Sequence, residues 1–96
     1  MNAPDTRFEA RAAAAAAVLR EEGAREVCVF GSAADGRATS RSDLDLAVVG
    51  LAPERFFKAM ARARDAAGVP IDLVNLDDDS PFVLALRQYG GLRRVA

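Results

Sequence analysis

Apolar residues recur at helical spacing in three parts of the 96-residue chain. The first stripe predicts a helix over residues 8–23, and Gly23 marks its end. The second predicts a helix over residues 53–67, with Pro53 in the first turn. A third predicts a helix over residues 82–89, with Phe82 and Tyr89 in the core. The residues assigned to the two longer stripes are Phe8, Ala12, Ala15 and Leu19, then Phe56, Met60, Ala63 and Ala67.

Three shorter segments alternate between the helices and predict strands. Residues 26–30 and 43–50 are rich in β-branched and apolar side chains, and residues 70–76 repeat that pattern. The segment between the first two strands is rich in turn residues and has room for one short helix. The order is therefore α-β-(α)-β-α-β-α, which predicts an α/β (α+β) fold with a small sheet. At this length we expect one domain over residues 1–96.

Composition removes several classes of function. The net charge of −1 gives no bulk attraction to nucleic acid, so we expect no direct nucleic-acid binding. The chain has no histidine, which excludes a histidine-based triad or zinc site, and a metal would need oxygen ligands, as Mg²⁺, Mn²⁺ or Ca²⁺ do. Cys28, the one cysteine, is expected to be a buried structural thiol. Neither a membrane span nor a signal peptide is predicted, so we expect a cytoplasmic protein.

Acidic residues interrupt two of the predicted strands. Asp43 and Asp45 share one face of their strand, about 6.6 Å apart, while Leu44 and Leu46 take the core face. Asp72 repeats the pattern in the next strand. If the two strands are neighbours, Asp72 comes to within about 5 Å of the pair. Three carboxylates on one surface repel each other and suit a divalent cation that also binds phosphate oxygens.

Gly31 and Ser32 follow the first strand and open the turn. Backbone N–H groups at such a position suit phosphate oxygens, glycine allows close approach, and the serine hydroxyl adds a donor. Arg37 and Arg41 lie between this predicted cradle and the acids. They could approach a triphosphate, although solvated surface charge explains them equally well.

Asp77, Asp78 and Asp79 form the other acidic cluster. They precede Ser80 and Pro81 at a predicted helix start, so N-capping and the helix dipole account for them without a metal. Their spacing also lacks the glycine and glutamate of a calcium loop.

The stretch "GSAADGRATSRSDLDL" resembles the GSx10DxD signature of the polymerase-β-like nucleotidyltransferase superfamily. Gly31-Ser32, ten residues and Asp43-x-Asp45 match it, and Asp72 lies where the third family carboxylate is expected. The resemblance covers nearly the whole chain and is greatest to the minimal nucleotidyltransferases (MNT), the antitoxin partners of HEPN-domain proteins. It implies a small mixed three-stranded sheet in the order 1-2-3, flanked by helices.

The resemblance also implies a reaction. A nucleoside monophosphate, most simply AMP from ATP, would pass from an NTP to a hydroxyl of a partner protein. Asp43 and Asp45 would bind two Mg²⁺ ions, or Mn²⁺, and Asp72 would bind the second ion and help to deprotonate the acceptor. Gly31 and Ser32 would hold the β- and γ-phosphates.

The acceptor remains open at this stage. Larger relatives carry a further domain for it, so a HEPN-domain protein in a hetero-oligomer, or a second copy in a homodimer, would complete the site. The alternative function is a non-catalytic antitoxin that neutralises a HEPN toxin by complex formation. An aminoglycoside or an RNA end is a weaker candidate as acceptor, given the near-neutral charge.

Overall fold

The computed structural model describes residues 6–31, 43–89 and 91–96. It contains three α-helices, one short 3₁₀ helix and four strands in this part of the chain. The helices are α1 (Thr6–Glu21), η1 (Pro53–Arg55), α2 (Phe56–Ala67) and α3 (Pro81–Tyr89). The strands are β1 (Glu26–Val29), β2 (Leu44–Val49), β3 (Ile71–Asn75) and β4 (Arg93–Arg94).

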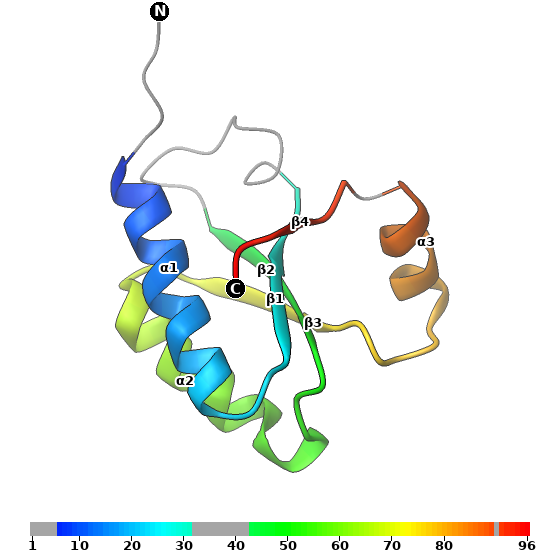
Figure 1. Cartoon of the computed structure of the whole chain (residues 1–96), viewed down its shortest axis with the longest axis horizontal. Helices are drawn as coiled ribbons and strands as arrows, with labels where there is room; N and C mark the ends of the chain where they lie inside the picture. The colour runs from blue at the N-terminus through cyan, green and yellow to red at the C-terminus, as the bar shows by residue number, and fades with distance from the viewer. Residues whose placement is uncertain (1–5, 32–42, 90) are drawn as a thin grey trace, which may run out of the picture.

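The strands form one mixed sheet in the order β3-β2-β1-β4 (Figure 1). β1 is antiparallel to β2 and to β4, whereas β2 and β3 are parallel. A parallel pair needs a crossover, and η1 with α2 supplies it. The predicted mixed sheet and the order of its first three strands are confirmed.

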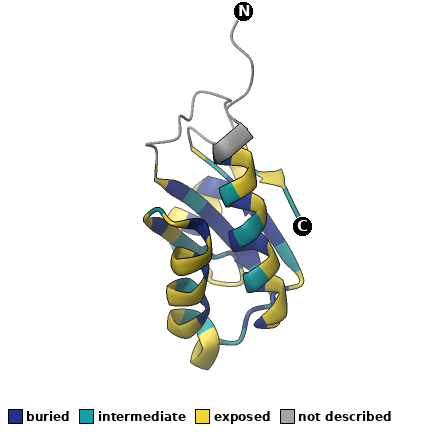
Figure 2. Cartoon of the chain, turned by 90° about the vertical axis from the view of Figure 1, so that its left-hand side faces the viewer, coloured by how far each residue is buried: buried dark blue, intermediate teal, exposed yellow. Residues whose placement is uncertain are grey.

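The main core lies between one face of the sheet and the helices α1 and α2 (Figure 2). Leu44, Leu46 and Val48 of β2 are fully buried on this face. The predicted α1 stripe is confirmed, because all four of its residues are buried. Where α1 and α2 meet, both helices present mainly alanines, which lets their backbones approach closely.

One partly buried ion pair joins the end of α1 to the middle of α2. Glu22 is 8% exposed, and its carboxylate accepts a hydrogen bond of 2.5 Å from the Arg62 guanidinium. The Arg55 guanidinium donates to the Glu22 carbonyl at 3.3 Å. A buried carboxylate needs such partners, so this contact fixes how α2 lies against α1.

The opposite face of the sheet is covered at one end by α3, as the right-hand side of Figure 1 shows. Val83 and Leu86 of α3 pack with Cys28 and Ala47. Cys28 is buried, as predicted, and burial, followed by the nearby Glu26 charge, raises the pKa of its thiol. Among the described helices, α3 covers this face and leaves part of it for polar side chains (Figure 1).

Three predictions about the fold were wrong. The sheet has a fourth strand, because residues 93–94 pair with β1 and the Arg94 guanidinium contacts Glu26 at 3.1 Å. Met60 and Phe56 are only half-buried, and Ala59 takes the inward position, because the close α1–α2 contact favours small side chains. Phe82 and Tyr89 are 59% and 79% exposed, since α3 buries only Val83 and Leu86.

The tight α1–α2 contact predicts a sharp difference between two alanines of α2. Ala63 is fully buried, so Ala63→Leu should destabilise the fold by about 1–3 kcal/mol through overpacking. Ala61 is exposed on the same helix, and Ala61→Leu should change stability by less than about 0.5 kcal/mol. Urea unfolding of both variants measures this difference. Equal stabilities would contradict the packing described.

Candidate active site

Asp45 and Asp72 are direct neighbours across the parallel pair. The register of β2 and β3 places the Cα atoms of these two residues opposite each other. Leu44 and Leu46 on either side of Asp45 are fully buried beneath α1 and α2, so Asp45 points to the opposite face. The sheet therefore brings these two predicted acids together, from positions 27 residues apart in the sequence.

The proximity of the two carboxylates changes the ionisation of Asp45. Partial burial raises the pKa of this carboxyl, and the Asp72 charge, a hydrogen bond with Asp72 and the Asp43 charge raise it further. Asp45 is half-buried, whereas Asp72 and Asp43 are exposed. A proton or a cation shared at this position relieves the repulsion.

Asp43 lies one residue before β2, on the same side of the strand. It acts on Asp45 through its charge, but the described residues contain no group of three acid or cysteine side chains arranged to hold a metal. Mg²⁺ in proteins is often held by one or two carboxylates, with water and substrate phosphates completing the shell. The two opposed carboxylates, with Asp43 beside them, fit an ion of this kind that arrives with a nucleotide.

Gly31 lies against Asp45 at the end of β1. The Phe30 N–H donates a hydrogen bond of 3.0 Å to the Asp45 carbonyl, which keeps the chain beside β2 up to this point. Gly31 has a φ of +66°, and a Cβ atom there would lie 2.6 Å from Asp45 Oδ2. Only glycine fits this close approach without moving the carboxylate. The other predicted residues of this loop, Ser32, Arg37 and Arg41, lie outside the described residues, as does the short helix predicted there.

A pocket of about 640 Å³ opens beside the acid pair, over the outer side of β3. Asp45 and Asp72 form part of its lining, and Arg64 lies at the α2 side. Sequence reasoning missed Arg64 and the aromatic walls, because they belong to helices and carry no motif spacing to the acids. The remaining lining residues are Phe30, Phe56, Phe57, Met60, Ile71, Leu73, Val74 and Phe82.

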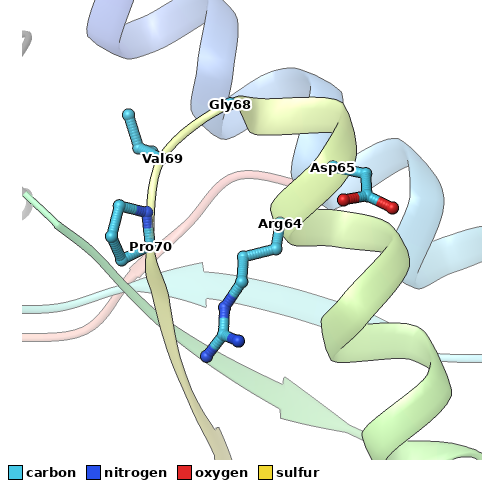
Figure 3. A pocket seen from close by; sticks show the side chains of 5 residues that line it. All are labelled: Arg64, Asp65, Gly68, Val69 and Pro70. Carbon is cyan, nitrogen blue, oxygen red and sulfur yellow. The ribbon is translucent and has the colours of Figure 1, made fainter.

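Arg64 also lines a second pocket of about 420 Å³, where α2 turns into β3 (Figure 3). Its side chain extends from α2 toward β3, whereas Asp65 points away from it. Asp65, Gly68, Val69 and Pro70 form the rest of the pocket lining. Arg64 thus carries a positive charge to the start of the strand that holds Asp72.

The predicted N-capping by the acidic cluster at residues 77–79 is wrong in one respect, because a serine caps the helix. Ser80 caps α3, because its Oγ accepts a hydrogen bond of 3.3 Å from the Val83 N–H. The Asp77 carboxylate instead accepts a hydrogen bond of 2.7 Å from the Gly50 N–H. This bond links the turns that follow β2 and β3 and so supports the parallel register.

Comparison with known families finds a family model that matches most of the chain. Residues 15–89 match the family model for polymerase beta, nucleotidyltransferase. The chain belongs to this family. No curated protein matches it.

Solved structures share the fold of this nucleotidyltransferase domain. A putative minimal nucleotidyltransferase is 25% identical, with a TM-score of 0.70, over 95% of this chain and 93% of that one. A toxin–antitoxin with AMP-PNP is 24% identical, with a TM-score of 0.61, over 79% of this chain and 66% of that one. The toxin–antitoxin MntA–HepT is 22% identical, with a TM-score of 0.54, over 79% of this chain and 62% of that one.

These structures differ in how much of their own length this chain covers. The domain spans nearly all of the minimal nucleotidyltransferase but slightly less than two thirds of the matched chains in the toxin–antitoxin structures. None of the helices in the described part of the chain has the length and apolar content needed to cross a bilayer.

The close approach of Gly31 to Asp45 predicts a specific effect of Gly31→Ala. The variant should displace the Asp45 carboxylate, which NMR of the Asp side-chain carbonyl carbons would detect at Asp45 and Asp72. Gly68 is the matched control, because it has a φ of +73° with nothing within 4 Å of an added Cβ. Gly68→Ala should cost about 1 kcal/mol of backbone strain and leave both carboxylates unchanged. Identical spectra for the two variants would refute this account.

Because Asp45 and Asp72 repel each other, removing the Asp72 charge should stabilise the fold, and the gain should depend on pH. A raised folded-state pKa means that Asp45 stabilises the fold below its unfolded pKa and that this stability is lost as the pH rises through the folded pKa. Asp72→Asn should therefore lower the pKa of Asp45 and stabilise the metal-free protein more at pH 7 than at about pH 3. NMR titration would measure the pKa of Asp45, and urea unfolding in the presence of a chelator would measure the free energy of unfolding. An unchanged Asp45 pKa would contradict the coupling.

Proposed function

We propose that this chain, acting over residues 1–96 as one minimal nucleotidyltransferase domain, transfers a nucleoside monophosphate from an NTP to a hydroxyl of a partner protein. The observation that carries the proposal is the opposition of Asp45 and Asp72 across β2 and β3, with Gly31 against Asp45. Two carboxylates held in repulsion at the edge of a pocket are costly in an apo protein and useful beside a cation and phosphates.

Asp43, Asp45 and Asp72 would hold Mg²⁺, with Mn²⁺ as an alternative. The bound ions would neutralise charge on the triphosphate and lower the pKa of the acceptor hydroxyl. Gly31 and Ser32 would position the β- and γ-phosphates through backbone N–H groups and the serine hydroxyl. The turn carrying Gly31 is anchored by the Phe30–Asp45 backbone hydrogen bond, so phosphates and acids would be held by one rigid corner of the sheet.

The reaction follows from this placement. The acceptor oxygen attacks the α-phosphorus and forms the new P–O bond, the bond from that phosphorus to the bridging oxygen breaks, and pyrophosphate leaves. The acceptor proton passes to Asp72 or to water. Since little covalent chemistry falls to the protein, positioning and charge neutralisation would supply most of the rate.

The proposed partner is a HEPN-domain toxin, with the nucleotidyltransferase as its antitoxin in the cytoplasm and ATP as the donor. Support comes from solved relatives of the same fold that are described as toxin–antitoxin structures, one of them with AMP-PNP. The alternative is an antitoxin that neutralises by complex formation alone. The acid pair favours the enzyme, because a binding module has no need for carboxylates that repel.

Intact-mass analysis of the partner tests transfer. The product of the adjacent open reading frame, expected to carry an R-x4-6-H motif, is mixed with this chain, Mg²⁺ and each of the four NTPs in turn. We expect the mass of a nucleoside monophosphate to be added with one NTP, and Asp43→Ala or Asp45→Asn to reduce transfer by roughly 10²-fold or more.

Asp65→Asn serves as the control, since Asp65 is exposed on α2 and points away from Arg64 (Figure 3). It should leave transfer unchanged. No added mass with any NTP would refute the enzymatic function. Neutralisation of the partner that persists in Asp43→Ala without transfer would establish the binding alternative.

A further inference from the structure

β3 is the outer strand of the sheet, and its free side forms the floor of the pocket beside the acids. Leu44 N–H donates to the Pro70 carbonyl at 3.0 Å, and Leu76 N–H donates to the Val48 carbonyl at 2.8 Å. Backbone groups alternate along a strand, so those of Ile71 and Leu73 point outward, away from β2. Among the described residues, nothing pairs with them. The opposite edge differs, because β4 covers β1.

The pocket runs along the free side of β3 and is called the edge groove, or simply the groove, from here on. Its walls are apolar and exposed. Phe57 of α2 is 74% exposed, and Phe82 of α3 is 59% exposed. Both line the pocket, one from each face of the sheet. An exposed aromatic pair beside an open strand edge is typical of a surface that another polypeptide covers.

The groove lies on the side of the acids where an acceptor is needed. Gly31, the start of the proposed phosphate cradle, contacts Asp45 from the β1 side. The groove reaches Phe30 but is lined mainly by β3 and α2, on the side of Asp72. The attacking oxygen and the leaving group of a phosphoryl transfer lie roughly in line on opposite sides of the phosphorus. With the triphosphate at Gly31, the acceptor therefore approaches across β3.

Charge selects the occupant of the groove. A second copy paired through its own β3 would bring another Asp45 and Asp72 to the same edge, and the like charges would repel. Arg64, in contrast, lines the groove, and its guanidinium has no hydrogen-bond or ion-pair partner among the described residues. It suits an acidic side chain from a different protein.

We propose that the acceptor is an extended segment of the partner protein that adds to β3 as a further strand and presents its hydroxyl to Asp72. Its backbone pairs with the outward groups of Ile71 and Leu73. On one face of the sheet, the added strand places its hydroxyl residue beside Asp72 and Phe82. On the other face, the added strand places an acidic side chain near Arg64 and an apolar side chain against Phe57. This inference rests on the proposed function, since it names the acceptor of the same site.

Peptide selection tests the surface without requiring chemistry. A phage-displayed library of linear twelve-residue peptides with a fixed central tyrosine is panned on the intact chain without nucleotide. The strongest binder is synthesised, and its affinity is measured by fluorescence anisotropy. We expect N-methylation of alternate backbone nitrogens to abolish binding and N-methylation of the nitrogens between them to leave it intact, because only one set faces β3.

Matched variants locate the bound peptide. Phe82→Ser should weaken binding about tenfold, whereas Leu84→Ser, on the same helix and 55% exposed, should not. Arg64→Glu should weaken it similarly, and Lys58→Glu, exposed elsewhere on α2, should not. Failure to select any peptide, indifference to N-methylation, or equal effects within each pair would overturn the proposal.

The two proposals fail separately. The selected peptide is incubated with the chain, Mg²⁺ and the four NTPs. Binding at the groove with no transfer to this peptide or to the partner refutes the proposed function, and the acceptor role falls with it. Transfer that survives Phe82→Ser, Arg64→Glu and N-methylation supports the function and overturns the edge-strand acceptor.

Discussion

The parallel register of β2 and β3 is the constraint on which the site depends. It places Asp45 opposite Asp72, and a shift of one residue would turn Asp72 toward the core and expose Ile71. Ile71 opposes such a shift, because it would have to leave the α1–α2 core, and the buried leucines of β2 hold that strand in the same way. The Gly50–Asp77 hydrogen bond holds the far ends of the same strands. The core that stabilises the fold therefore also sets the spacing of the two acids.

The residues of the candidate site lower the stability of the fold at one corner of the sheet. Asp45 is half-buried beside two other carboxylates, and its raised pKa expresses the cost of ionising it there. Gly31 adds a left-handed backbone conformation and a close approach that excludes a side chain. Such local costs are common at functional sites, where the surrounding core holds groups in energetically unfavourable positions. Here the alanine-rich contact of α1 with α2 and the Glu22–Arg62 pair provide that support.

The two edges of the sheet are treated differently. β4 closes the edge at β1 with two residues and an ion pair to Glu26. Within the described part of the chain, β3 leaves its outer backbone groups open between exposed aromatic walls, next to the acids. Open edges invite pairing with other chains, so an edge left open beside a candidate active site fits a domain that works on a protein partner. Such an arrangement would join recognition and chemistry in one small sheet.

Much of this protein follows from local patterns in its sequence. Period-2 and period-3.6 spacing located three strands and three helices, and the spacing of Gly31, Asp43 and Asp45 indicated the nucleotidyltransferase family, because both depend on neighbours in the chain. The tail strand, the exposed Phe82, the inward Ala59 and the position of Arg64 did not follow. Each depends on how distant parts of the chain pack: on β1 for the tail, on α1 for Ala59, on the edge of β3 for Arg64, and on which face of α3 meets the sheet for Phe82. Asp72 stands between these cases, since its alternation was local but its place beside Asp45 was decided by parallel pairing across the α2 crossover.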